Sequence, residues 1–282
     1  MTALAPILRQ LLAAREPVVL VRVARAKGST PREAGVAMLV TAGAAHGTIG
    51  GGRLEWEAIS RARELLAGDA RASTFEMPLG PAVGQCCGGH VRLELVRAGA
   101  AELDALAAEE ARVLESLPTV LLFGAGHVGR ALARALSPLP LRLRWIDGRA
   151  GEFPDPPLAG PEVVVTERPL AEIRAAPAGS VYVVMTHSHG LDFELCEAVL
   201  RRDDFAYLGL IGSRTKRARF ERGWRELGLS EQQMSRLVCP IGGRVRDKRP
   251  AVIAALVAAE ILHALAEPAT EREHKTTGEA AA

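Results

Sequence analysis

A glycine pattern in the middle of the chain constrains the fold more than any other feature. Gly124, Gly126 and Gly129 directly follow the apolar stretch TVLLF and precede the helical run HVGRALARAL. In this context the first glycine allows a tight turn, the second lets a phosphate approach the backbone, and the third lets the helix pack closely on the strand. Amides at the start of that helix favour an anion. The pattern therefore predicts the strand, turn and helix of a dinucleotide-binding type of sheet.

After residue 118, apolar strands alternate with helical stretches. The strand-like segments are TVLLF, LRLRWID, EVVVT, VYVVMT and YLGLIG. Such alternation is typical of a parallel sheet that helices cover on both faces. The last helical segment, residues 250–266, begins with a proline, which suits a first helical position. We therefore expect an α/β fold in which residues 118–266 form a Rossmann-like, doubly wound parallel sheet.

The first hundred residues have a different pattern. The segments PVVLVRVAR, VAMLVT and HVRLELVR are typical of strands, and apolar residues recur at helical spacing between the second and the third. A chain of 282 residues suggests two domains, because one domain takes about 150 residues. We expect a smaller α+β domain over residues 1–99, a connecting helix over 100–117, the Rossmann-like domain over 118–266 and a disordered tail over 267–282.

Composition excludes several classes of protein. The net charge is only +2, so no global field attracts nucleic acid or an anionic membrane. The most apolar run, residues 251–266, is shorter than the roughly 20 residues that span a bilayer, and no secretory leader is evident. Four cysteines are too few for a disulfide framework, and Cys196 and Cys239 lie in apolar surroundings that predict core positions. We expect a cytoplasmic protein that binds neither nucleic acid nor membranes.

Asp147 ends the strand after the glycine turn. At this position an acidic residue binds ribose hydroxyls and repels a 2′-phosphate, so Asp147 taken alone favours NAD over NADP. The alternative is a turn that builds the fold and binds no nucleotide. An NAD-dependent oxidoreductase is therefore one hypothesis, with His187, His189 and Asp192 as candidates for proton transfer.

Glycine-rich loops in the first domain are further candidates. Cys86 and Cys87 are adjacent in QCCGG, where an accessible thiolate could bind a soft metal or carry sulfur. Two small buried residues in a tight turn are the alternative. The lack of a CxxC partner argues against a structural zinc site. Residues 28–32 and 47–52 are either polar cradles for a ligand or hairpin turns.

Polar segments also follow two later strands, at the sheet edge where α/β proteins bind ligands. His187 and His189, in THSHGLD, could bind a metal, transfer protons or only hydrogen-bond within the loop. Ser213 could cap the next helix, and Arg214 could bind a phosphate or carboxylate. The basic residues from Lys216 to Arg225 predict a solvated face, or else a docking surface for an acidic partner.

The chain resembles the XdhC/CoxI family of molybdenum-enzyme maturation proteins, and within it the xanthine dehydrogenase accessory members most closely. The resemblance runs from about residue 18 to 265 through the ordered motifs GSTPRE, GTIGGGRLEWEAI, GQCCGGHVRLEL, FGAGHVGRALA, WIDGR, THSHGLD, YLGLIGSRTKR and CPIGG. It implies a homodimeric chaperone rather than an enzyme. Such a protein binds the molybdenum cofactor (Mo-molybdopterin), protects it while a cysteine desulfurase adds the sulfido ligand, and inserts it into apo-xanthine dehydrogenase.

Combined with this resemblance, the motifs suggest roles for particular residues. We expect Gly124, Gly126 and Gly129 to seat the phosphate end of molybdopterin, and Cys86 or Cys87 to face the molybdenum or handle sulfur. The remaining candidates for cofactor binding are Asp147, His187, His189, Ser213 and Arg214. No catalytic residue is assigned. Which cysteine acts, and whether the pterin carries a further nucleotide, stay open.

Overall fold

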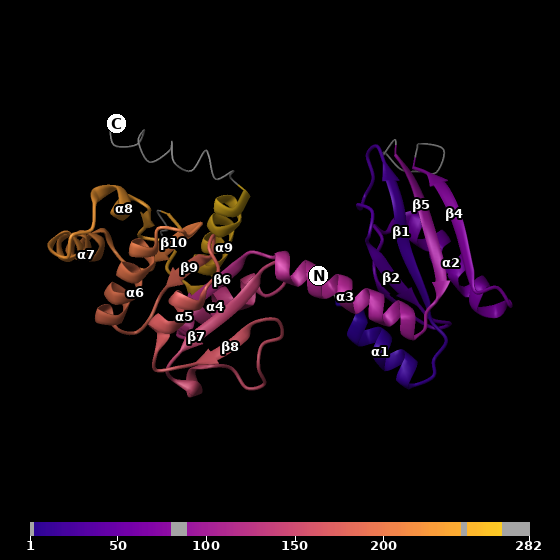
Figure 1. Cartoon of the computed structure of the whole chain (residues 1–282), viewed down its shortest axis with the longest axis horizontal. Coiled ribbons are helices and arrows are strands. Elements are labelled where there is room, and N and C mark those ends of the chain that lie inside the picture. The colour runs from indigo at the N-terminus through magenta and orange to yellow at the C-terminus, as the bar shows by residue number, and fades with distance from the viewer. Residues whose placement is uncertain (1–2, 80–88, 244–246, 267–282) are drawn as a thin grey trace. The chain divides into compact units, whose positions relative to one another are not determined.

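The computed structural model describes residues 3–79, 89–243 and 247–266, so the predicted tail lies outside the described residues (Figure 1). The chain divides into two compact units, one formed by residues 2–115 and the other by residues from 116 onward. Each unit has its own sheet. The two are described separately below.

The first unit contains a five-stranded antiparallel sheet in the order β3-β2-β1-β5-β4. Its strands are β1 (Val19–Lys27), β2 (Ala37–Val40), β3 (Ala45–Gly47), β4 (Ala72–Pro78) and β5 (His90–Arg97). Helix α2 (Gly52–Ala67) packs its buried residues Leu54, Ala58 and Ala62 on one face. These lie at the predicted helical spacing, so apolar periodicity in the sequence located this helix.

The other face of this sheet is covered by α1 (Ala5–Ala13) and α3 (Ala100–Ser116). Alternate residues of β1 supply the two faces: Val19 and Val21 point toward α2, and Leu20 packs with α1 and α3. The Glu110 carboxylate of α3 accepts hydrogen bonds from the first amides of α1. Helix α3, expected as a connection between domains, is therefore a packed layer of the first unit.

The second unit contains a six-stranded parallel sheet in the order β11-β10-β9-β6-β7-β8. Its strands are β6 (Thr119–Phe123), β7 (Arg142–Asp147), β8 (Glu162–Val165), β9 (Val181–Val184), β10 (Tyr207–Leu210) and β11 (Leu237–Val238). The expected mixed fold, with a Rossmann-like doubly wound sheet in the second half, is confirmed. The two-residue strand β11 has no counterpart among the predicted strands.

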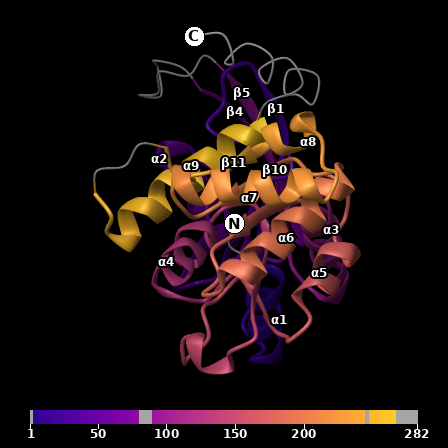
Figure 2. The same cartoon turned by 90° about the vertical axis from the view of Figure 1, so that its left-hand side faces the viewer.

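Helices cover both faces of this parallel sheet. Helices α4 (His127–Leu136) and α9 (Pro250–Ala266) pack on one face, and on the other lie α5 (Pro169–Ala175), α6 (His189–Arg202), α7 (Arg214–Glu226) and α8 (Glu231–Ser235). In Figure 2, α6 and α7 run side by side, and their Phe193 and Trp224 rings stack 5.4 Å apart.

The apolar run in α9 is a core element, since Ala254, Val257 and Ile261 are buried. None of the helices within the described ranges is long and apolar enough to cross a membrane.

The strand order fixes where a ligand can enter. The chain moves outward from β6 through β7 to β8, and then returns to the other side of β6 to form β9. The loops that leave β6 and β9 therefore diverge toward opposite faces of the sheet. Their carboxyl ends frame the topological switch point, which is where open α/β sheets bind ligands.

Candidate functional site

The three glycines of the turn after β6 occupy different environments. Gly124 has φ +114°, and a Cβ there would lie 2.3 Å from the Met185 carbonyl oxygen. A Cβ on Gly129 would lie 2.1 Å from the Gly124 carbonyl oxygen, whereas one on Gly126 would meet nothing within 4 Å. The turn and packing roles predicted for Gly124 and Gly129 are confirmed. Gly126 leaves open space at the start of α4.

Buried contacts hold this turn in place. The Trp145 indole donates a hydrogen bond to the Gly124 carbonyl at 3.0 Å, and the Gly124 amide donates to the Ile146 carbonyl at 2.8 Å. The Ala125 amide donates to Asp147 Oδ2 at 2.8 Å. Gly126 is the N-cap of α4, and no described side chain caps the helix there. Its first amides are therefore available to an anion.

Asp147 is fully engaged within the protein. Its buried carboxylate accepts two hydrogen bonds from the Arg149 guanidinium, both at 2.9 Å, in addition to the bond from Ala125. Burial acts to raise the pKa of Asp147, but the Arg149 side chain and the amides of Ala125 and Arg149 outweigh it and hold the pKa below its usual value. A ribose would have to compete with Arg149 for this carboxylate.

The charges near the turn largely balance one another. Arg149 also contacts Glu152 at 3.3 Å, and the same glutamate pairs with Arg130 of α4. Arg130 further donates to the Glu152 carbonyl at 2.7 Å. Two arginines thus face two carboxylates. An anion would therefore be attracted to the start of α4 chiefly by the free amides of that helix, rather than by excess side-chain charge.

A cavity of about 240 Å³ lies at the carboxyl ends of β6, β7 and β9. Its floor is apolar, with Phe123, Ile146 and Leu195 among the lining residues. Its polar rim includes Gly124, Asp147, Arg149, Glu167, Thr186 and His187. An apolar floor with a few polar groups at the rim suits a flat heterocycle that carries polar substituents.

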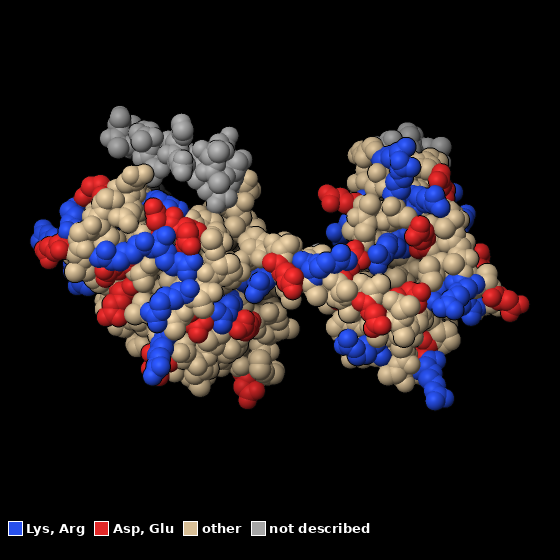
Figure 3. Space-filling model, viewed as in Figure 1, with Lys and Arg blue, Asp and Glu red and all other residues tan. Residues whose placement is uncertain are grey.

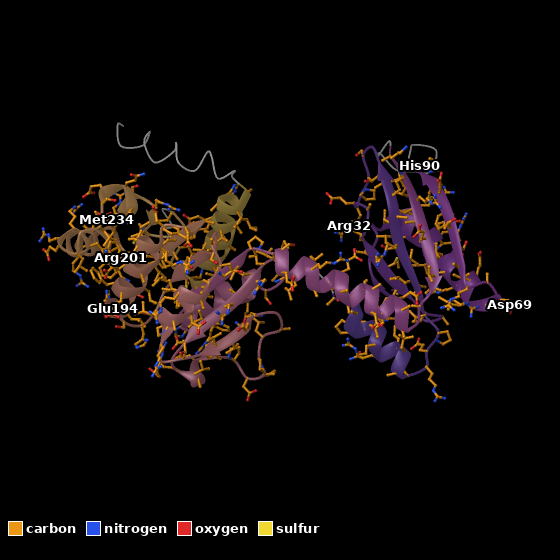
Figure 4. The ribbon with its side chains drawn as sticks, viewed as in Figure 1. Arg32, Asp69, His90, Glu194, Arg201 and Met234 are labelled. Atoms are coloured by element: carbon orange, nitrogen blue, oxygen red, sulfur yellow. The ribbon has the colours of Figure 1, made fainter. Side chains whose placement is uncertain are left out.

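The two histidines of THSHGLD lie apart. His187 is exposed at the rim of the cavity, whereas His189 begins α6 and lines a separate hollow with Phe193, Glu194 and Arg219. Figure 4 labels Glu194, one of the residues that line this hollow. Within the described ranges, no group of three or more histidine, cysteine or acidic residues could hold a metal ion. The metal interpretation of the histidine pair therefore gains no support.

The last residue of that motif is a buried structural group. Asp192 is 1% exposed, and its Oδ1 accepts hydrogen bonds from the Thr186 amide at 3.0 Å and the Thr186 hydroxyl at 2.7 Å. Its Oδ2 accepts a hydrogen bond from Lys216 Nζ at 2.6 Å. These bonds leave Asp192 committed to the fold rather than available as an acid or base.

Lys216 corrects one prediction from the sequence. A solvated basic face was expected over the run that begins with it, but the Lys216 side chain is only 9% exposed and pairs with Asp192. The physical reason is helical spacing, because Lys216 lies on the same face of α7 as the buried Phe220 and Trp224. That spacing of four residues is a signal in the sequence that could have identified it.

The other basic residues of α7 are exposed or half-buried, and two of them are neutralised by acidic partners. Arg217 pairs with Glu221 at 2.7 Å, and Arg225 pairs with Glu231. On the face that Figure 3 shows, basic and acidic side chains are interspersed rather than separated by sign. A docking surface that attracts acidic partners by charge alone therefore has limited support.

The remaining residues singled out in the sequence, Ser213, Arg214 and the cysteines, lie away from the cavity or outside the described residues. Ser213 caps α7, because its hydroxyl accepts a hydrogen bond from the Lys216 amide at 3.1 Å, as predicted. Arg214 is exposed beside it, and neither residue lines the cavity. Cys196 and Cys239 are buried as predicted. Cys86 and Cys87 lie outside the described residues.

The glycine-rich loop at 47–52 is occupied by a carboxylate of the same chain. Glu55 accepts hydrogen bonds from the amides of Ile49, at 3.0 Å, and Gly51, at 3.2 Å, and from the Thr48 hydroxyl. The loop connects β3 to α2, so it is not a hairpin turn. Three amides of the loop, those of Ile49, Gly50 and Gly51, are thus bonded within the chain, and this role of Glu55 was missed from the sequence.

The loop at 28–32 belongs to the connection between the antiparallel strands β1 and β2, so it is part of a hairpin. It packs closely on its neighbours. A Cβ on Gly50 would lie 2.8 Å from the Pro31 ring, and one on Gly89 would lie 2.3 Å from the Ser29 carbonyl oxygen. Figure 4 labels Arg32 in this connection and His90 at the start of β5. Three of the recognised motifs thus meet in the first unit.

Comparisons with known proteins cover both units. Residues 120–261 match the XdhC Rossmann domain, and residues 11–76 match the XdhC and CoxI family. The uncharacterized protein YqeB of Escherichia coli (strain K12) is 28% identical over 252 residues, which are 87% of this chain but only 43% of that protein. The chain thus spans less than half the length of this relative.

A solved structure shares the fold. A crystal structure described as a xanthine dehydrogenase from Bacillus halodurans matches with a TM-score of 0.72 and 16% identity, over 94% of this chain and 96% of that one. The glycine turn, Asp147, the cavity and Lys216 all lie inside the segment that matches the XdhC Rossmann domain. The chain therefore belongs to the XdhC/CoxI family.

Proposed function

We propose that this chain is a cytoplasmic chaperone that binds the molybdenum cofactor, protects it while a cysteine desulfurase adds the sulfido ligand, and promotes its insertion into xanthine dehydrogenase. One observation carries the proposal. In a member of the XdhC/CoxI family, α4 begins with uncapped amides, and Gly124 in the turn before it lines a cavity of about 240 Å³ at the switch point of the sheet. The description of the solved relative as a xanthine dehydrogenase supports the choice of client.

The residues present suit the parts of molybdopterin. Its phosphate matches the amides that follow Gly126, where a Cβ would meet nothing within 4 Å. Its polar pterin matches a cavity with an apolar floor and the side chains of Asp147, Arg149 and His187 at the rim. When bound, the cofactor supplies the molybdenum chemistry that the client enzyme uses. The task of this chain is to bind it, orient it and exclude water.

The other candidates have narrower roles in this proposal. Cys86 or Cys87 would face the molybdenum or handle sulfur. His189, Ser213 and Arg214 do not line the cavity, so they would contact only a ligand that extends beyond it. The homodimer implied by the family resemblance and the partnership with a cysteine desulfurase belong to the same proposal.

The test is the molybdenum and pterin content of the chain purified from a host that makes the cofactor. The key variant is Gly126→Asp, because aspartate is a favoured N-cap residue and would place its own carboxylate on the helix amides. We expect this variant to keep its stability and lose about nine-tenths of its bound pterin. Gly43→Asp, at another glycine with open space in the first unit, is the matched control and should retain it.

Each outcome decides a part of the proposal. A wild-type chain that acquires neither molybdenum nor pterin, even when mixed with free cofactor, would overturn the proposed function. A folded Gly126→Asp variant with undiminished pterin would show that α4 does not bind the phosphate, and would leave the rest of the proposed function standing.

The strand order favours a second candidate, an NAD-dependent oxidoreductase, because this topology binds dinucleotides in many enzymes. The bonds from Arg149 to Asp147 weaken it, since that carboxylate would otherwise bind ribose. A titration with NADH distinguishes the two candidates. Micromolar binding by a chain that carries no pterin would favour the oxidoreductase.

A further inference from the structure

The loops that follow β6, β9 and β10 at the carboxyl edge of the parallel sheet are joined by close packing and by hydrogen bonds. The turn after β6 packs on the loop after β9, since Gly124 leaves no room for a Cβ beside the Met185 carbonyl. The next residue, Thr186, is held by Asp192 through its amide and its hydroxyl. Asp192 is in turn bonded to Lys216. The contacts therefore pass from one loop to the next.

Lys216 completes this series at the third loop. Besides the bond to Asp192, its Nζ donates to the carbonyl of Ile211, directly after β10, at 3.0 Å. Its stem passes close to Gly212, where a Cβ would lie 2.8 Å from Lys216 Cδ. A single ammonium group thus connects the loop after β10 with the first turn of α6, which in turn holds Thr186 in the loop after β9. Thr186 and its neighbour His187 line the cavity, whereas Lys216 does not.

The burial of this ion pair argues for a specific role. The Lys216 and Asp192 side chains are 9% and 2% exposed, and a buried ion pair seldom stabilises a fold more than a well-packed apolar pair would. Its geometric effect is different, because the pair fixes the direction of the Asp192 carboxylate. Both oxygens are then used, Oδ1 by Thr186 and Oδ2 by Lys216.

We propose that Lys216 is a positioning residue that acts through Asp192 to hold Thr186 and His187 at the rim of the cavity. The inference rests on the proposed function only in taking this cavity as the binding site. Lys216 itself touches no ligand in this arrangement. Its effect is to keep the rim in one conformation before a ligand arrives, which lowers the entropic cost of binding.

The test compares Lys216→Met with the double variant Asp192→Asn, Lys216→Met. The single change leaves a buried carboxylate without its cation and should lower stability. The double change removes both charges, so stability should recover. In the single variant, we expect the Thr186 amide to exchange with solvent about tenfold or more faster than in the wild type, and the NMR shifts of the His187 imidazole to change. In the double variant, both changes should persist although stability has recovered. A purely structural pair would return both signals to wild-type values together with stability.

Two further variants keep the test decisive. Arg217→Met with Glu221→Gln removes a more exposed ion pair from the same helix and should leave the Thr186 signal unchanged. Gly212→Ala should displace the Lys216 stem without changing any charge, and should also speed exchange at Thr186. If the Gly212→Ala protein and the recovered double variant both exchange at the wild-type rate, the inference is wrong.

The outcome is separate from that of the proposed function. Exchange and imidazole shifts are measured on the full chain without ligand, so they report positioning even if the chain binds no cofactor. If the wild type does acquire molybdopterin, the recovered double variant should retain less of it than the variant with changes at Arg217 and Glu221.

Discussion

A Cβ atom on Gly129 would lie 2.1 Å from the carbonyl oxygen of Gly124, a separation that a real side chain cannot adopt. The start of α4 is thus pressed against the turn that precedes it. The Trp145 indole donates a hydrogen bond to the same carbonyl at 3.0 Å. This close approach holds the turn and the start of α4 together.

The first prediction separates packing from ligand approach within this turn. Gly129→Ala should lower the free energy of unfolding by about 3 kcal/mol, because either the turn or the helix must move. Gly126→Ala should cost less than about 1 kcal/mol, since its Cβ enters open space and only the N-cap preference changes. Urea unfolding of the two variants measures both values. Equal losses would contradict the different roles given to these glycines.

The second prediction concerns the loop that Glu55 occupies. Glu55→Ala removes an acceptor used by two amides and one hydroxyl, and should lower the free energy of unfolding of the first unit by about 2 kcal/mol. Glu57→Ala, in the same helix, loses only an exposed ion pair with Arg61 and should cost about 0.5 kcal/mol or less. Thermal or urea unfolding checks both, and a Glu55→Ala protein as stable as the Glu57→Ala control would show that the loop does not depend on this carboxylate.

Periodicity in the sequence predicted most of the fold, because strands and helices in this chain bury one face or are wholly buried. It was sufficient for β5, where Val91, Leu93 and Leu95 alternate with exposed residues. It did not place α3, whose buried Leu106 packs against residues far away in the chain. Only Leu106 of this helix is fully buried, and one buried side chain does not reveal which layer the helix joins.

The site was less predictable, because it depends on partners distant in sequence. The glycines and Asp147 could be recognised from local spacing alone. The bond between Lys216 and Asp192 joins residues 24 positions apart, and both were first assigned other roles. Arg149 stands in the motif WIDGR but was given no role of its own, although the two bonds from its guanidinium to Asp147 decide how that carboxylate is used.

The third prediction concerns thiol reactivity. Burial raises the pKa of Cys196 far above its usual value and also raises that of Cys239, so neither should react quickly as a thiolate. In a variant with Cys86→Ser and Cys87→Ser, native protein at pH 8 should react with a thiol reagent much more slowly than the unfolded chain. Mass spectrometry of the labelled peptides identifies the sites. Rapid labelling of Cys196 in folded protein would contradict its buried position.

The fourth prediction is a dependence of stability on pH that comes from Asp147. Its pKa in the folded state lies below the ordinary value of 3.8, because Arg149 and two amides bind the charged form. The unfolded chain therefore takes up the proton first as the pH falls. The stabilisation by Asp147 is fully present above about pH 4 and is lost as the pH falls through the lower, folded-state pKa.

Asp147→Asn tests this relationship directly. At pH 7 the variant should be less stable than the wild type by about 1 to 2 kcal/mol, since hydrogen bonds to a charged group are lost. That difference should stay constant down to about pH 5 and shrink below about pH 4, where the wild-type carboxylate also becomes neutral. Glu226→Gln, at an exposed position in the same unit, is the control and should match the wild type at pH 7. Urea unfolding from pH 3 to 7 measures the difference, and a gap that stays undiminished at pH 3 would mean that the Asp147 carboxylate is not its source.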